Sequence, residues 1–194
     1  MSGLIICGFP GVGKSSVGGW NNCVDLESSH FSRGWEGNMI LFPKNGLRMA
    51  WASEDESVEV YRCPSWVARY SDVGLDLAKQ GYTVLMSTHK DVIEILKAQQ
   101  YVAENSMPIV IFCPKSDMRG AWVERLQRRY DDTGSPKDFR ALKRVKDYFE
   151  QDLAYLEKTG LPIYRPSTMD YDLKTYISLI RDMQQNAKER NGGA

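Results

Sequence analysis

The sequence is poor in the residues that most readily build metal centres. Its 194 residues include only two histidines and four cysteines. The cysteines, Cys7, Cys23, Cys63 and Cys113, lack the short spacings of a zinc site or a disulfide framework. Three of them fall in or beside apolar runs, where a reduced cysteine packs as a small hydrophobe. We therefore expect a reducing, cytoplasmic environment.

Two further absences narrow the class of partner. No apolar run is long enough to span a membrane, and the apolar start is interrupted by glycines too early for a signal peptide. Lys and Arg number 25, as do Asp and Glu, so no overall basic field favours nucleic acid. We expect no membrane contact, no nucleic-acid partner and one α/β domain over residues 1–194, and nothing here indicates an oligomeric state.

Against these absences stands one glycine-rich stretch, Gly8-Phe9-Pro10-Gly11-Val12-Gly13-Lys14-Ser15. It matches the full pattern of a phosphate-binding loop, follows a strand-like apolar run and precedes residues that can open a helix. Glycines let the backbone approach a polyphosphate, Lys14 can reach its β- and γ-phosphates, and Ser15 can ligate Mg²⁺. The N-terminal charge of the following helix is expected to assist. The alternative is a glycine-rich turn with an accidental lysine.

The pattern thus predicts an ATP and Mg²⁺ site. Its expected binding residues are Gly8, Gly11, Val12, Gly13, Lys14, Ser15 and Ser16.

Acidic residues end the second predicted strand, residues 22–27. In open α/β sheets the strand ends face the ligand, so Asp25 is expected to hold Mg²⁺ through water or to accept a proton from a substrate. Glu27 is a weaker candidate for contacting the acceptor substrate. The alternative is that both acids cap the next helix. Residues 87–89 end the third predicted strand and should lie nearby.

Residues 33–63 are interpreted as an insertion. Two apolar runs, 39–42 and 47–51, flank an Asn-Gly pair that is typical of a hairpin turn. The aromatic residues Phe31, Trp35, Phe42 and Trp51 can stack on a base or cover the sheet edge.

The second half of the chain predicts a fourth strand at 108–113, a helix beginning after it, a loop at 131–136, a helix at 137–158, a short strand at 161–164 and a closing helix at 171–189. Between residues 115 and 146, ten Lys and Arg oppose five Asp and Glu. We expect four arginines of the first of these helices to converge on one anion, although most helical arginines are simply solvated. They are Arg119, Arg125, Arg128 and Arg129.

With these features the chain resembles the small P-loop kinases, above all nucleoside monophosphate kinases and their phage-encoded deoxynucleotide kinase relatives. The loop carries the resemblance, and the stretch 124–129, Glu-Arg-Leu-Gln-Arg-Arg, resembles the helix that leads into the lid of such kinases. The resemblance implies a three-layer P-loop NTPase fold with about five parallel strands, an insertion after strand 2 and a short lid, residues 116–140, after strand 4.

The resemblance also implies roles for individual residues. Arg125 and Arg129 would be catalytic lid arginines alongside Lys14 and Asp25, with Arg140 or Lys143 joining them. Apart from the resemblance, if the acceptor is a nucleoside monophosphate, Arg33 and Arg69 are expected to bind its phosphate, because an arginine fork suits phosphate bidentately. The Asp-Gly-Phe-Pro-Arg type signature of many such kinases is replaced by Ser87-Thr88-His89-Lys90-Asp91. That stretch, together with Asp25-x-Glu27-x-x-His30, is closer to small-metabolite kinases resembling gluconate kinase.

Three functions therefore remain open from the sequence. The leading one is ATP- and Mg²⁺-dependent phosphoryl transfer to a (deoxy)nucleoside monophosphate. A gluconate-kinase-like or nucleoside kinase would instead phosphorylate a hydroxyl, with Asp25 as base. A nucleotide-dependent switch or a nucleic-acid-associated ATPase would hydrolyse ATP without a small acceptor.

Overall fold

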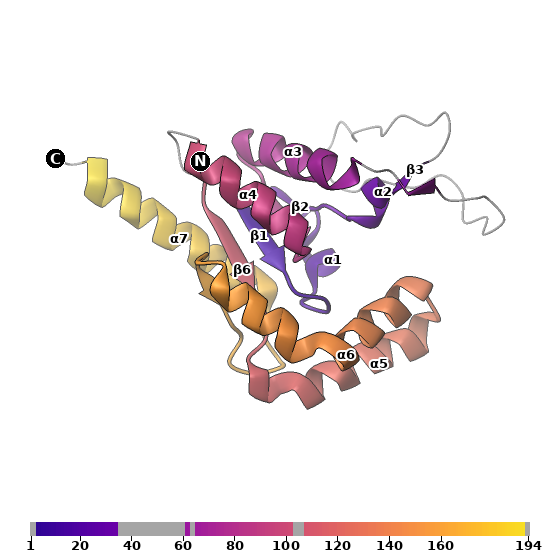
Figure 1. Ribbon diagram of the computed structural model, residues 1–194. Helices are drawn as coiled ribbons and strands as arrows, with labels where there is room; N and C mark the ends of the chain where they lie inside the picture. The colour runs from indigo at the N-terminus through magenta and orange to yellow at the C-terminus, as the bar shows by residue number, and fades with distance from the viewer. Residues whose placement is uncertain (1–2, 35–60, 63–64, 103–106, 193–194) are drawn as a thin grey trace.

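The computed structural model of the protein describes residues 3–34, 61–62, 65–102 and 107–192. These residues form an α/β fold around a parallel sheet, with α3 and α4 together on one side of the sheet and α7 on the other (Figure 1). The five sheet strands are β1 Leu4–Gly8, β2 Cys23–Asp25, β5 Thr83–Ser87, β6 Ile109–Phe112 and β7 Ile163–Tyr164. The five predicted strands are thereby confirmed, the second and fifth being shorter than expected.

The sheet is ordered β2-β5-β1-β6-β7, and all of its pairings are parallel. The central strand β1 is buried at all five positions, as its uninterrupted apolar sequence requires of a strand covered on both faces. From β1 the chain moves outward to β2 on one side, and from β6 it moves outward to β7 on the other. The loops after β1 and β6 therefore leave the sheet in opposite directions. Open sheets bind ligands in the crevice beside such a point.

Seven α-helices lie in the described part of the chain: α1 Lys14–Val17, α2 Ser29–Ser32, α3 Trp66–Lys79, α4 Lys90–Val102, α5 Arg119–Thr133, α6 Pro136–Lys158 and α7 Leu173–Gly192. A short 3-10 turn, η1 Ser116–Met118, precedes α5. Helix α3 ends before Gly81, whose φ of 94° stops a helix at no steric cost. None of these helices is long and apolar enough to cross a membrane.

Helices α5 and α6 form an antiparallel hairpin that extends beyond the sheet (Figure 1). The predicted loop at 131–136 is wrong, because α5 continues to Thr133 and α6 begins at Pro136. Gly134, with φ 59°, donates its N–H to Tyr130 O and closes α5, while the Ser135 side chain accepts from Lys137 N and caps α6. Glycine after one helix and proline at the start of the next are terminal signals rather than signs of a long loop.

A second, two-stranded sheet pairs β3 Arg33–Gly34 with β4 Tyr61–Arg62 in antiparallel fashion. The predicted hairpin strands 39–42 and 47–51, with Trp35, Phe42 and Trp51, lie outside the described residues. Phe31 is described: it is buried and meets Tyr70 edge-on at 5.2 Å, so it belongs to the core.

Candidate functional site

The Gly8–Ser15 loop leaves the carboxyl end of the central strand. Gly11 and Gly13 have φ values of 88° and 86°, which L side chains rarely adopt. A Cβ on Gly8 would lie 2.7 Å from Val12 Cγ2, so the first glycine is required by close packing within the loop. Lys14 folds back over the loop, and its Nζ donates to Gly8 O at 3.0 Å. The backbone of the loop is therefore shaped by its glycines, with one ammonium group held over it.

Side chains of helices α5 and α6 pack against this loop and hold it in place. Phe9 is fully buried and meets Phe149 of α6 at 5.6 Å and Trp122 of α5 at 6.5 Å, both edge-on. Trp122 Nε1 also donates to Pro10 O at 2.7 Å. A Cβ on Gly11 would come within 3.0 Å of that same Nε1, so the indole fits closely beneath the loop.

Ser15 and Ser16 begin helix α1, which has only four residues. So short a helix carries little macrodipole, and the expected contribution of its N-terminal charge is correspondingly small. Ser15 lines the cleft described below, whereas Ser16 Oγ donates to Gly13 O at 2.7 Å. Ser16 thus supports the loop, and Ser15 is the hydroxyl that faces the cleft.

Both predicted acids, Asp25 and Glu27, line the cleft beside the loop. Asp25 Oδ1 is buried and has no hydrogen-bond partner among the described residues. Burial raises the pKa of Asp25, and Lys14 opposes that shift. Burial likewise lowers the pKa of Lys14, against the opposing effect of the two carboxylates. The Lys14 ammonium and the two carboxylates thus each favour the charged form of the other, against the effect of burial in a partly desolvated site.

Glu27 is held in place from two directions. It forms an ion pair with Lys137 of α6 and accepts from Ser29 N at 3.4 Å and from Ser29 Oγ at 3.3 Å. Burial acts to raise the pKa of Glu27, but Lys137, Lys14 and the Ser29 N–H outweigh it, and the pKa is lowered. Glu27 therefore stays ionised and bridges the sheet to the helical hairpin.

The end of β5 supplies the opposite wall. Ser87, Thr88 and His89 all line the cleft, as expected for residues that end a neighbouring strand. His89 Nε2 is 3.2 Å from Ser28 Oγ, and its ring meets Trp66 edge-on at 5.2 Å. Burial, and then the charges of Arg144 and Lys14, lower the pKa of His89, so the imidazole is neutral near pH 7.

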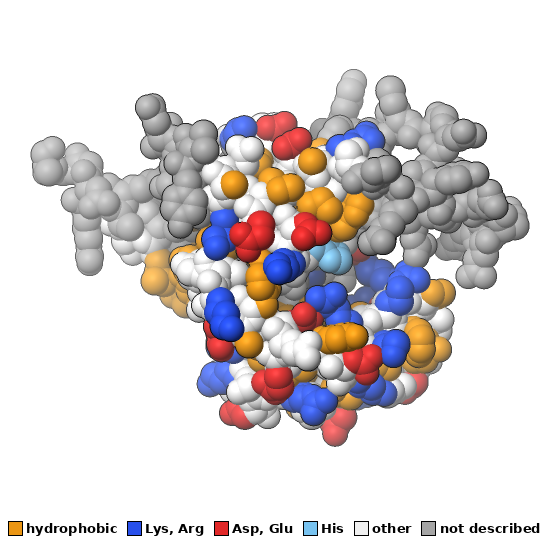
Figure 2. Space-filling model, in the orientation of Figure 1, with side chains coloured by type: hydrophobic (Ala, Val, Ile, Leu, Met, Phe, Trp, Pro, Cys, Tyr) orange, Lys and Arg blue, Asp and Glu red, His pale blue; other side chains and the backbone are white. Residues whose placement is uncertain are grey.

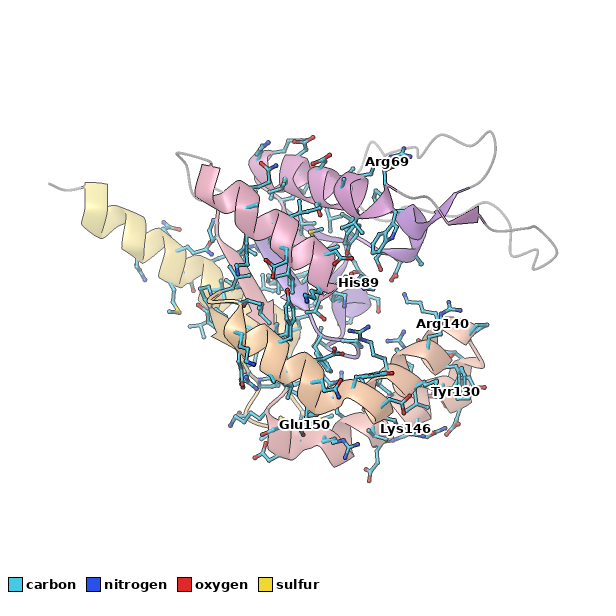
Figure 3. The ribbon with its side chains drawn as sticks, viewed as in Figure 1. Arg69, His89, Tyr130, Arg140, Lys146 and Glu150 are labelled. Atoms are coloured by element: carbon cyan, nitrogen blue, oxygen red, sulfur yellow. The ribbon has the colours of Figure 1, made fainter. Side chains whose placement is uncertain are left out.

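Cations from the hairpin complete the cleft. Arg129 of α5 lines it and forms an ion pair with Asp138, a buried residue in the first turn of α6. Along α6 seven residues line the same cleft, and Figure 3 shows Arg140 directed toward it from the far end of the hairpin. These residues, here called the α6 row, are Lys137, Arg140, Ala141, Lys143, Arg144, Asp147 and Tyr148.

The predicted convergence of four arginines does not occur in this structure. Arg119 donates to Lys146 O at 2.9 Å, and Arg128 is exposed and does not line the cleft. Arg125 lies over the rings of Trp122 and Tyr171, at 5.7 and 5.2 Å from their centroids, beside Gly13 rather than in the cleft. Arg129 alone among the four lines the cleft.

Of the two predicted acceptor arginines, Arg69 is not brought to the cleft. Arg69 is exposed on α3, on the side turned away from the hairpin (Figure 3). The backbone of Arg33 pairs with Arg62, and its side chain lies outside the described part of the chain. Sequence reasoning placed no role on Lys137, Arg144 or Tyr148, although their spacing beside the apolar stripe of α6 was a usable signal.

Together these residues enclose a cleft of about 600 Å³, within the range of small-molecule sites. Figure 2 shows a histidine beside the hollow, with Lys and Arg side chains across from it. Within the described residues, no cluster of three or more His, Cys, Asp or Glu could hold a metal ion by itself. A cation here would need oxygen atoms of a bound ligand in addition to Asp25 and Ser15.

No known family model matches this chain, and no curated protein matches it. The assignment of function therefore depends on the residues themselves.

Proposed function

We propose that the protein is a phosphotransferase of the P-loop NTPase fold, which transfers the γ-phosphoryl group of ATP to a small acceptor. The observation that carries the proposal is the convergence of the Gly8–Ser15 loop, the Asp25 carboxylate and Arg129 on one cleft at the carboxyl edge of a parallel sheet. A polyphosphate in the loop would meet backbone amides, the Lys14 ammonium and the hairpin cations.

Mg²⁺ fits the residues present. The buried Oδ1 of Asp25 has no partner among the described residues, and an orphaned carboxylate oxygen in a partly desolvated cleft needs a cation or water. Asp25 and the Ser15 hydroxyl would hold the ion, whose chemistry is to neutralise charge on the transferring phosphoryl group. Hard oxygen ligands of this kind suit Mg²⁺ rather than a soft metal.

The chain's own residues would do the rest by position and charge. Lys14 would neutralise the β- and γ-phosphates, and Arg129 would stabilise the charge that develops during transfer. The α6 row and the wall containing His89 would bind the acceptor and exclude water, which would otherwise accept the phosphoryl group. The resemblance favours a (deoxy)nucleoside monophosphate as that acceptor.

One observation favours a hydroxyl acceptor of the gluconate-kinase or nucleoside-kinase kind instead. Arg69, a predicted ligand of the acceptor phosphate, is exposed on α3 and turned away from the hairpin. In that alternative Asp25, whose pKa burial raises, would serve as the base that takes the hydroxyl proton. A nucleic-acid-associated ATPase or switch would show acceptor-independent hydrolysis.

A coupled kinase assay tests the proposal. The wild-type protein is assayed with ATP and Mg²⁺ against deoxynucleoside monophosphates, nucleosides and sugar acids, and Lys14→Ala is assayed beside it. We expect one acceptor class to be phosphorylated and Lys14→Ala to abolish transfer with an unchanged circular dichroism spectrum, because backbone amides alone leave the phosphate charge uncompensated. Near-native turnover by Lys14→Ala, or DNA-stimulated hydrolysis with no acceptor phosphorylated, would exclude this function.

A further inference from the structure

A buried hydroxyl lies between the carboxyl ends of β2 and β5. Tyr70 of α3 is fully buried, and its Oη donates to Leu26 O at 2.8 Å and accepts from Ser87 N at 2.9 Å. A phenol has one proton to donate and lone pairs to accept with, so both functions of this group are used on main-chain atoms. One side chain thus joins two strands.

The hydroxyl occupies the place of the next bond in the strand ladder. Leu26 N–H donates to Leu85 O at 2.9 Å, which is the last regular bond between the two strands. In a continued parallel ladder the following bond would run from Ser87 N–H to Leu26 O. Tyr70 receives that N–H and donates to that carbonyl, so two hydrogen bonds span a gap that one would otherwise close.

Beyond this point a side-chain contact joins the two chain segments. Ser28 Oγ and His89 Nε2, two residues further along each segment, are 3.2 Å apart. Along the two segments, a backbone hydrogen bond is followed by the two bonds of the Tyr70 hydroxyl and then by a side-chain contact. This order is expected of strands that diverge. Both Ser28 and His89 line the cleft, so the ends of the two segments form part of its wall.

Packing holds the Tyr70 side chain, here called the wedge between the two strand ends, in one position. The Tyr70 ring meets Phe31 at 5.2 Å and Trp66 at 6.1 Å, and Trp66 in turn meets the His89 ring at 5.2 Å. A ring with zero exposure between these neighbours cannot withdraw without opening the core. The hydroxyl is therefore presented to the strands by a rigid support.

We propose that Tyr70 is a positioning residue: its hydroxyl keeps the ends of β2 and β5 apart and so fixes the part of the cleft lining that carries Ser28 and His89, which determines which acceptor fits. This inference rests on the proposed function, because it assigns that part of the cleft to the phosphoryl acceptor. The Gly8–Ser15 loop follows β1, on the other side of β5 from β2, and its first residue, Gly8, is paired with Ser87, so the rest of the loop lies away from the wedge.

Tyr70→Phe removes the hydroxyl and keeps the ring. Ser87 N–H and Leu26 O would then be left unpaired in a buried place, and the ladder should close by one bond, with an N to O distance near 2.9 Å in a crystal structure of the variant. Because a shift on the order of 1 Å is enough to misplace a substrate, we expect kcat/KM for the preferred acceptor to fall roughly 10²-fold. The dissociation constant for ATP should not change. Tyr82→Phe, half-buried at the opposite end of β5, is the matched control.

Wild-type protein gives an independent measurement. By nuclear magnetic resonance we expect a slowly exchanging Tyr70 hydroxyl proton with a cross-peak to the Ser87 amide, and this holds even if Tyr70→Phe fails to fold. An exchange-broadened hydroxyl, or a Tyr70→Phe structure with the strand ends still apart and unchanged acceptor selectivity, would overturn the inference. If no acceptor is phosphorylated by the wild-type protein, the proposed function fails, and the crystallographic distance and the hydroxyl proton still decide whether the wedge exists.

Discussion

Arg129→Ala would change two things at once, and the structure shows how to separate them. Arg129 lines the cleft and forms an ion pair with Asp138; the side chains are 40% and 5% exposed, respectively. Asp138 also accepts from Thr133 Oγ1 at 2.7 Å. The variant therefore removes a cation from the candidate site and leaves a buried carboxylate with a hydroxyl as its remaining partner.

The size of each effect follows from this geometry. Removing one member of a buried ion pair costs about 3–5 kcal/mol, whereas an exposed pair contributes about 0–1 kcal/mol. Because Arg129 is partly exposed and Thr133 remains, we expect a loss of about 2 kcal/mol of unfolding free energy. For a chain of this length that lowers Tm by roughly 4–8 °C. Turnover should fall on the order of 10³-fold if the guanidinium stabilises the transition state.

The double variant Arg129→Ala with Asp138→Asn separates stability from catalysis. Asparagine removes the unpaired buried charge, so we expect Tm to recover most of its loss while turnover stays low. Arg128→Ala, at an exposed position next along α5, is the control and should change neither quantity. Thermal unfolding by circular dichroism and the coupled kinase assay, run well below Tm, give the two readouts. If turnover returns together with stability in the double variant, Arg129 only holds the hairpin, and the catalytic reasoning is refuted.

Two further predictions concern the acid side of the pH range. Asp25→Asn should lower kcat while leaving the affinity for ATP within a few-fold. It should also remove the acid limb of the pH–rate profile, which the raised pKa of Asp25 places at a higher pH than an ordinary aspartate would. A loss of Tm with full activity would show that Asp25 is structural. Burial lowers the pKa of His30 from 6.5 to about 4, so the unfolded chain binds a proton that the folded chain does not, and stability should decrease as pH falls through that window. Urea unfolding at pH 7 and pH 5 should show that His30→Gln loses less unfolding free energy on acidification than the wild-type protein. An equal loss in both proteins would contradict the attribution of this pH dependence to His30.

The sheet could be predicted because its signals are local. Strands buried on both faces need uninterrupted apolar runs, and glycine or proline marks where helices begin and end. The error at 131–136 has the same origin. Gly134 and Pro136 were interpreted as one loop, whereas each belongs to the end of a different helix, and only the hydrogen bonds of Gly134 and Ser135 distinguish the two cases.

The site could be predicted only in part. That the loop and Asp25 lie beside one cleft could be predicted, because strand ends converge in a parallel sheet. Where each arginine lies could not be predicted, because helical periodicity gives the face of a residue but not what that face meets. Arg125 meets Trp122 and Tyr171, which come from distant parts of the chain. The role of Tyr70 could not be predicted from its own helix, because the use of its hydroxyl depends on two strands to which it does not belong.

The packing of Phe9 also has a consequence for the order in which the molecule acquires its shape during synthesis. Its ring contacts Trp122 and Phe149, and Pro10 O receives the Trp122 N–H across 112 positions of sequence. A nascent chain that stops before α6 lacks half of this support, although the whole loop left the ribosome long before. Contacts between residues so distant in sequence form late, after the intervening chain has been ordered. The loop is thus synthesised before α5 and α6, and its packing is complete only when both helices are in place.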